Sequence, residues 1–462
     1  MQNMPCTKMS VPRFAVRNQK IAKTFSIAAL TVLMSLAASA EQNGGETMTY
    51  RHFEVEDADG RVARMMPVAT TQTPLWAREV RQSPFDWRTQ SAGRNPVFLP
   101  IIPFVLPPPE GSGEPFYGHN HQPDITWLPN GDLMAIWYST RGESGLELTV
   151  LASRFRAGAG EWDPSSEFFK APERNMHGSA LFHDGAGTLY HFNGMGPRDV
   201  KGWRSLALLL RTSRDNGVSW TPPRTISSGD RYQHRHQVIG GVRQMRGGTL
   251  VMLCDLYAGQ SGGTAVHVSQ DSGKTFADPG GDILGVHAGL VELKDGRWMA
   301  FGRGNNIDGK MPKSISNDHG QTWTYSPTEF PVIRGGQRLV LMRLNEGPIV
   351  LFSFTSRREE PESGDMNFMD SKGNAFIGHG LFASLSYDEG QTWPVRKLIT
   401  PGEGDWDGGA HHRRFTATPT RAEPAGYLAA TQSPDDMIHL ISSRLHYRFN
   451  LAWLEKAADP VE

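Results

Sequence analysis

One eight-residue pattern occurs four times in this chain, and it constrains the fold more than any other feature. Each copy begins with Ser, has Asp at its third and Gly at its fifth position, and ends in an aromatic residue; the copies are residues 213–220, 269–276, 316–323 and 386–393. Asp accepts hydrogen bonds from nearby amides, Gly adopts a positive φ and the ring folds back, so each copy predicts a tight turn. The starts lie 56, 47 and 70 residues apart. This spacing indicates a repeated unit of about fifty residues, the size of a four-stranded propeller blade.

A second repeat lies between these turns and consists of an apolar strand, a turn and another apolar strand. Six such hairpins begin near residues 121, 177, 237, 287, 337 and 427. Short turn sequences rich in Asn, Asp and Gly mark their tips. Six hairpins predict an all-β, six-bladed β-propeller over residues 115–456. Residues 41–114 are predicted to be an N-terminal arm, part of which closes the last blade so that no sheet edge is exposed.

The first forty residues differ in composition from the rest of the chain. They carry five basic and no acidic side chains, and an apolar run over residues 25–37 ends in Ala38, Ser39 and Ala40. This pattern predicts a signal peptide over residues 1–40 and a periplasmic or secreted protein. The run is shorter than the ~20 residues of a membrane-spanning helix, so we expect no membrane association after cleavage.

Charge and cysteine content narrow the function classes further. The formal net charge is −1, and the loss of the five basic residues of the signal makes it −6. A mildly acidic protein has no electrostatic basis for binding nucleic acid. Cys6 and Cys254 are the only cysteines, so the mature protein has no intrachain disulfide. We expect a monomer whose partner is a glycan.

The residues that open the six hairpins are unusually polar. In a propeller these residues converge on one central pocket, because the innermost strands begin near the axis on one face. The candidates are His119, His121, Arg174, His177, His236, His287, Arg338 and Tyr427. A single His at such a place is most simply a solvated strand end. A ring of histidines and arginines favours acid–base chemistry on an anionic sugar instead.

Two His-x-His pairs raise the question of a metal. His119 with His121, and His234 with His236, place both rings on one face of an extended chain, a geometry that can hold a transition metal. The sequence offers no definite third or fourth ligand. Solvated strand ends are therefore the simpler interpretation, and no metal or other cofactor is predicted.

The eight-residue pattern is that of the Asp-box, and residues 115–455 resemble the sialidase superfamily of BNR-repeat β-propellers. This resemblance implies an arginine triad for the substrate carboxylate, a tyrosine nucleophile with a glutamate partner, and an aspartate acid/base. Tyr427 matches the nucleophile and Arg303 matches one arginine of the triad. His287 stands where the glutamate partner is expected.

Other parts of the sialidase pattern are replaced. His119 and its neighbours stand in place of an Arg-Ile-Pro motif, and His379 lies near the position of the third arginine. The acid/base loop contains Arg141, Glu143 and Glu147 but no aspartate. These departures disfavour the hydrolysis of N-acetylneuraminate.

The sequence predicts an exported enzyme that cleaves a terminal acidic or deoxy sugar from a glycan, as a glycoside hydrolase or a uronate lyase. In the lyase, Tyr427 beside His287 abstracts the C5 proton while Arg303 or Arg338 neutralises the uronate carboxylate. Propeller-type lyases that act on rhamnose-glucuronate linkages resemble the chain in this respect. In the hydrolase, Glu143 or Glu147 supplies the acid. The alternatives are a genuine exo-α-sialidase and a non-catalytic carbohydrate-binding propeller.

The predicted site therefore has two groups of residues. The predicted catalytic residues are Tyr427, His287, His177 and Glu143. The predicted substrate-binding residues are His119, His121, Arg141, Arg174, His236, Arg303, Arg338 and His379.

Overall fold

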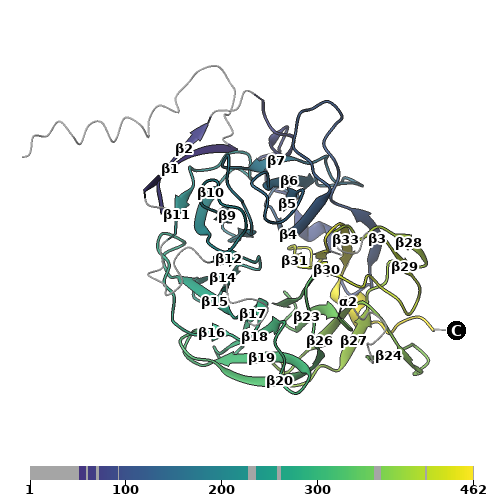
Figure 1. Cartoon of the computed structure of the whole chain (residues 1–462). Helices are drawn as coiled ribbons and strands as arrows, with labels where there is room; N and C mark the ends of the chain where they lie inside the picture. Colours follow the sequence, from purple (N-terminus) through teal and green to yellow (C-terminus); the bar gives the residue numbers. More distant parts are fainter. Residues whose placement is uncertain are drawn as a thin grey trace, which may run out of the picture. The chain divides into compact units, whose positions relative to one another are not determined.

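Antiparallel sheets of four main strands are the building unit of the fold, and six of them are arranged around one centre (Figure 1). The structure, a computed structural model, describes residues 51–58, 61–68, 72–91, 93–226, 236–256, 262–357, 366–410 and 414–460. These residues belong to one unit that spans Met48–Glu462. The prediction of a six-bladed β-propeller is confirmed.

The strands of each blade follow one another along the chain from the innermost outward, except in the last blade. The first blade consists of β4 (His119–Trp127), β5 (Leu133–Thr140), β6 (Thr149–Phe155) and β7 (Ser166–Phe169). The second consists of β8 (Ser179–His183), β9 (Leu189–Met195), β10 (Ala207–Ser213) and β11 (Arg224–Thr225). The third consists of β12 (His236–Val238) with β13 (Arg243–Gln244), β14 (Leu250–Leu256), β15 (Thr264–Ser269) and β16 (Asp282–Ile283).

The other three blades complete the ring. The fourth blade consists of β17 (Val286–Glu292), β18 (Trp298–Arg303), β19 (Lys310–Ser316) and β20 (Thr324–Pro331). The fifth consists of β22 (Val340–Arg343), β23 (Ile349–Phe354), β26 (Leu381–Ser386) and β27 (Val395–Leu398). The sixth consists of β31 (Ala429–Gln432), β32 (Ile438–Ile441), β33 (Leu445–Phe449) and β3 (Phe98–Pro103). Between the last two blades, β21 (Gln337–Arg338) pairs in parallel with β30 (Gly426–Tyr427).

Smaller elements lie outside the blades. They are the hairpins β1 (His52–Ala58) with β2 (Arg61–Val68), β24 (Asn367–Met369) with β25 (Ala375–Ile377) and β28 (Gly404–Trp406) with β29 (Phe415–Ala417), the 3-10 turns η2 (Leu75–Ala77) and η3 (Trp87–Gln90), and the short helix α2 (Leu451–Glu455). No helix among the described residues is long and apolar enough to cross a membrane.

The second strand is buried along its whole length in most of the blades. Every residue of β5, β9, β14 and β23 is buried. Each blade packs against a neighbour on both of its faces, so these strands are continuous apolar runs with no polar face. A polar residue inside such a run is therefore an exception that requires a hydrogen-bond partner.

The four repeated turns join the third strand of a blade to the fourth. In each one the Gly amide donates to the Ser hydroxyl, at 2.8 to 3.0 Å, and the Asp carboxylate accepts the amide of the residue four positions later, at 2.9 Å. The residue before each Gly also has a positive φ, between 56° and 61°. Each turn therefore contains two consecutive residues with positive φ, and the sequence predicted only the Gly.

The aromatic residue of each turn is buried between neighbouring blades. Trp220 of the second blade packs on Phe168 of the first, with ring centroids 5.2 Å apart. Trp393 of the fifth blade packs on Phe330 of the fourth at 5.3 Å. The repeat therefore supplies the contact that holds one blade to the preceding blade.

The outermost strand of the sixth blade comes from the N-terminal side of the chain. β3 pairs antiparallel with β33, with Phe98 opposite Phe449. Pro100 and Pro103 lie in this strand, and an edge strand tolerates proline because one side of it needs no donors. The sheet is thus built from both ends of the propeller sequence.

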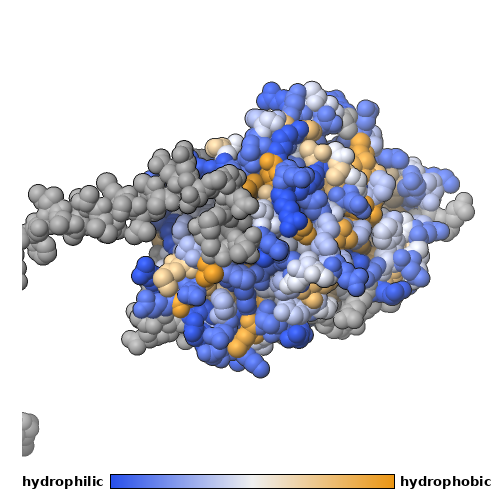
Figure 2. Space-filling model, turned by 90° about the horizontal axis from the view of Figure 1, so that it is seen from above, coloured by the Kyte–Doolittle hydropathy of each residue, from blue (hydrophilic) through white to orange (hydrophobic). Residues whose placement is uncertain are grey.

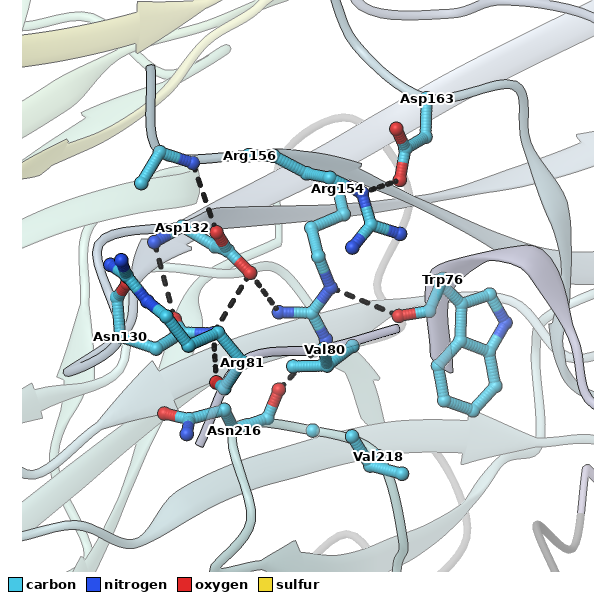
Figure 3. A network of polar contacts seen from close by, with 12 residues as sticks. Trp76, Val80, Arg81, Asn130, Asp132, Arg154, Arg156, Asp163, Asn216 and Val218 are labelled. Atoms are coloured by element: carbon cyan, nitrogen blue, oxygen red, sulfur yellow. Dashed lines mark hydrogen bonds and ion pairs between the residues drawn. The ribbon is translucent and has the colours of Figure 1, made fainter. Parts of the chain in front are cut away.

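A buried arginine ties the N-terminal segment to two blades (Figure 3). Arg154 of β6 donates from Nε to the carbonyl of Trp76 at 2.9 Å, and from Nη2 to the carbonyl of Asn216 at 2.7 Å. Its Nη1 lies 3.1 Å from the Asp132 carboxylate. One guanidinium therefore contacts the arm, a turn of its own blade and the repeated turn of the second blade.

The surface in Figure 2 is largely hydrophilic, with hydrophobic side chains scattered among polar ones. Exposed large hydrophobic residues such as Val200, Tyr325 and Ile377 lie on different blades and loops. Scattered apolar residues of this kind are normal for a protein surface.

Candidate functional site

The residues that open the inner strands meet at one end of the propeller axis. His119 and His121 begin β4, His177 precedes β8, His287 lies in β17 and Tyr427 in β30. The rings of His121 and Tyr427 are 3.8 Å apart, those of His287 and Tyr427 4.9 Å, and those of His119 and His121 5.5 Å. Strands from different blades thus bring these predicted residues together.

Tyr427, His287 and Asp255 form a hydrogen-bonded series at the centre of this site. The Tyr427 hydroxyl lies 3.0 Å from Nε2 of His287. Nδ1 of His287 bonds to one oxygen of Asp255, and the other oxygen accepts the backbone amide of His287 at 2.6 Å. All three side chains are buried. The Asp255 carboxylate thereby fixes both the ring and the backbone of His287.

The hydrogen bonds determine where the protons lie. A carboxylate only accepts, so Nδ1 of His287 carries the proton that it shares with Asp255. Nε2 of the neutral ring is then an acceptor, and the hydroxyl of Tyr427 donates to it. Burial, together with the charge of Arg303, lowers the pKa of His287 to about 4. The ring is neutral near pH 7 and is placed to take the phenol proton.

The backbone at His287 is strained. Its φ is +51°, a value that a residue with a side chain rarely adopts, and the register of β17 shifts between Val286 and Gly289. Such conformations cost of order 1–3 kcal/mol and persist where the surrounding structure imposes them. Here the two hydrogen bonds to Asp255 impose it, and the bulge turns the His287 ring toward Tyr427.

Arg303 is the cation nearest to the phenol. Its Nη1 donates to the Tyr427 hydroxyl at 3.0 Å and to the carbonyl of Gln337 at 2.7 Å. The guanidinium carbon lies 5.4 Å from the centroid of the Tyr427 ring. The guanidinium therefore donates to the same oxygen that faces Nε2 of His287. Tyr427 thus has an acceptor for its proton and a donor to its oxygen.

Glu143 stands at the exposed side of the site. The Tyr138 hydroxyl donates to its Oε1 at 2.8 Å, and Nε2 of His119 lies 3.4 Å from the same atom. Burial opposes ionisation of Glu143, but the hydrogen bonds from His119 and Tyr138 and the charge of His177 outweigh it and lower its pKa to about 2. Glu143 is thus a carboxylate near pH 7, not a proton donor.

His177 forms another wall of the site. Its Nε2 lies 2.9 Å from the side-chain amide of Gln237, and its ring stacks on Trp203 with centroids 5.1 Å apart. The close approach depends on Gly178, where a Cβ would lie 2.7 Å from the carbonyl oxygen of Val238. Burial lowers the pKa of His177 to about 4. The buried Nδ1 has no hydrogen-bond partner within the described part of the chain.

Other predicted residues lie differently. The guanidinium of Arg338 lies 5.5 Å from the centroid of the Tyr427 ring and donates to the backbone carbonyls of Pro123, Ile239 and Leu428. These three bonds hold the guanidinium in place, and substrate binding by Arg338 stays a prediction. Arg174 is buried and donates to the carbonyl of Gly196.

The remaining three predicted residues are peripheral or undescribed. Arg141 is exposed, with its guanidinium 5.0 Å from the centroid of the Tyr117 ring. The backbone of His379 bonds to Thr420 and Ala422, and the residue is partly exposed. His236 begins β12, but its side chain, like the whole of His234, lies outside the described residues.

Four polar or aromatic residues of the site were not predicted. Asp255 and Tyr138 each lie in an otherwise largely apolar strand. A polar group at such a position is the sequence signal that could have identified them. Gln237 follows a predicted histidine, and Trp203 lies on a loop whose position the sequence does not reveal. No group of three or more potential metal-ligating side chains is found in the described ranges.

Comparison with known proteins assigns the chain to a family. The family model described as BNR repeat-like domain matches residues 131–440, more than half of the chain. The chain belongs to the BNR repeat-like domain family. Within this sialidase-like superfamily, it is 25% identical over 365 residues to a sialidase of Micromonospora viridifaciens, covering 72% of this chain and 51% of that protein. The chain therefore spans about half the length of this curated relative.

Solved structures share the fold of this BNR repeat-like protein. A protein of unknown function from Dyadobacter fermentans superimposes with a TM-score of 0.55 at 13% identity, covering 77% of this chain and 99% of that one. The NanB sialidase of Streptococcus pneumoniae gives a TM-score of 0.51 at 13% identity, covering 76% and 70%. At this identity the likeness establishes the propeller, and function depends on the site.

Proposed function

We propose that this protein cleaves a glycosidic bond beside an acidic sugar of a glycan, with Tyr427 as the reacting phenol. The observation that carries the proposal is the series Tyr427, His287 and Asp255, with Arg303 on the phenol oxygen. A binding protein has no need for a phenol that is hydrogen-bonded to a neutral, carboxylate-oriented imidazole. The glycoside-hydrolase-like propeller and the similarity to a sialidase support the same class of substrate.

Elimination needs a base and an acid on one side of the sugar, and Tyr427 with His287 supplies both. Tyr427 gives its proton to Nε2 of His287, and the phenolate takes the C5 proton of a uronate. The electron pair forms the C4–C5 double bond as the C4–O bond breaks. The proton then passes from Tyr427 to the departing oxygen, and His287 returns its own to Tyr427. Arg303 donates to the phenol oxygen throughout these steps.

Hydrolysis is the second candidate, favoured by the correspondence of Tyr427 and Arg303 to sialidase positions. In that route the phenolate attacks the anomeric carbon, and the leaving oxygen needs a proton from an acid. Glu143 is the carboxyl group on the exposed side of the site, but its pKa of about 2 leaves it ionised. Hydrolysis thus requires a substrate that changes the surroundings of Glu143, whereas elimination does not.

A panel of glycans tests the proposal. Purified protein is incubated with oligosaccharides that carry terminal uronate, sialate or neutral sugars, and products are followed by mass spectrometry and ultraviolet absorbance. We expect turnover of an acidic glycan, with an unsaturated product that absorbs in the ultraviolet. A product heavier by one water, without that absorbance, would indicate hydrolysis. Binding without any product across the panel would identify a carbohydrate-binding propeller and overturn the proposal.

A further inference from the structure

A second cavity lies at the other end of the propeller axis. It has a volume of about 540 Å³ and is lined by the last residues of the inner strands, including Trp127 of β4, His183 of β8 and Glu292 of β17. The Tyr427 site is built from the first residues of the same strands. The cavity is therefore separate from that site, and its volume is within the ~300–1,000 Å³ of typical small-molecule sites.

Most charged groups around this cavity already have partners. Arg343 binds Glu389 through two contacts, at 2.6 and 3.0 Å, and Lys294 lies 3.6 Å from the same carboxylate. Arg246 lies 3.5 Å from Glu292. These pairs belong to the rim and leave no reason to expect a ligand there.

Arg243 differs from these residues. Its Nη1 donates to the adjacent carbonyl of Val242, and its buried Nε has no hydrogen-bond partner among the described residues. The carboxylate of Asp124, which also lines the cavity, accepts the amides of Ile125 and Leu181, and its charge attracts Arg243 without supplying an acceptor to Nε. A buried N–H of a guanidinium without a partner is costly, so a ligand acceptor at Arg243 would be favourable.

His183 presents a second donor to the same cavity. Its side chain is buried, with 7% of the residue exposed, and Nδ1 accepts the amide of Gly185 at 3.2 Å. Nε2 of the neutral ring therefore carries the proton, and this buried atom also has no partner in the described part of the chain. Burial lowers the pKa of His183, which keeps the ring neutral.

The rest of the wall is largely apolar. Phe182, Val242, Leu290 and Met342 line the cavity beside the indole of Trp127. A charged and a neutral N–H donor line the same cavity, and an ionised carboxylate accepts from both kinds of donor. Apolar walls match a ring or an aliphatic body attached to it.

We propose that this cavity is a binding site for a small carboxylate with an apolar body, held by Arg243 and His183. The site takes no part in the chemistry at Tyr427 and stands whether or not the protein cleaves a glycan.

Binding of 4-bromobenzoate to the full chain tests this inference. Calorimetry gives its affinity, and the anomalous signal of bromine in a soaked crystal gives its position. We expect saturable binding with the bromine in this cavity, and weaker binding of neutral 4-bromobenzamide and of phenyl phosphate. Arg243→Gln is expected to weaken binding at least about tenfold, because it removes a charge-assisted hydrogen bond.

Two further variants make the result decisive. His183→Gln is an independent test if Arg243→Gln does not fold, and it is expected to weaken binding several-fold. Arg246→Gln is the matched control, since this cation lines the same cavity but is already paired with Glu292. Unchanged affinity in Arg243→Gln and His183→Gln, a bromine peak at the Tyr427 site, tighter binding of phenyl phosphate, or no binding to the wild-type protein would each overturn the inference.

Discussion

Tyr427→Phe is expected to reduce kcat by about 10²–10⁴-fold on an acidic glycan while substrate affinity changes little. The substitution removes only the hydroxyl group that bonds to His287 and Arg303. The ring remains, and with it the packing against His121 at 3.8 Å and over Arg338. The loss therefore falls on the chemical step. Single-turnover kinetics and calorimetric binding measure the two quantities separately.

Tyr387→Phe is the matched control for this experiment. Tyr387 is the second residue of the last repeated turn, and its exposed side chain bonds through the hydroxyl to Glu455. Its replacement is expected to leave kcat and substrate affinity unchanged. A Tyr427→Phe enzyme as active as the wild type would show that the phenol takes no part in bond cleavage.

Asp255→Asn is expected to produce the second large effect, a fall in kcat of the order of 10³-fold with little change in KM. The backbone amide of His287 needs Oδ1 as its acceptor, so the new amide nitrogen faces Nδ1 of the ring. The ring proton moves to Nε2, and Tyr427 loses its acceptor. The equivalent change in a Ser-His-Asp triad costs about 10⁴-fold for the same reason.

A pH profile distinguishes this positioning role of Asp255 from a merely structural one. Activity requires neutral His287, whose pKa is about 4, so the wild-type rate falls as the pH decreases through that value. The charge of Asp255 favours the imidazolium; its removal lowers this pKa further, and the acid limb moves to lower pH. Asp370→Asn, which alters a buried aspartate in a distant turn, is expected to leave both kcat and the acid limb in place.

The repeated turns made the fold predictable, because each turn places its own hydrogen-bond donors and acceptors within eight residues. The regular spacing of the blades also made much of the site predictable. Once six inner strands are assigned, the positions of His121, His287 and Tyr427 at their openings follow from the geometry of a propeller. Their convergence in the structure is a consequence of that geometry, and no local sequence pattern is needed to produce it.

Other parts of the site depend on contacts between blades that the sequence does not encode locally. Asp255 lies 32 residues before His287 and on a different blade, and only the packing of the two blades pairs them. Arg338 was expected to bind a ligand because arginine is polar and opens a hairpin. In the structure, its guanidinium donates hydrogen bonds to the backbone carbonyls of Pro123, Ile239 and Leu428. Buried backbone carbonyls need such donors.

A double-mutant cycle between Tyr427→Phe and Asp255→Asn tests most directly whether Tyr427, His287 and Asp255 act as one catalytic unit. Residues of such a unit have strongly non-additive effects on kcat. We predict that the double variant turns over an acidic glycan at the rate of the Tyr427→Phe single variant. A double variant slower by the product of the two single effects would contradict this account, because it would show that Asp255 acts independently of the phenol.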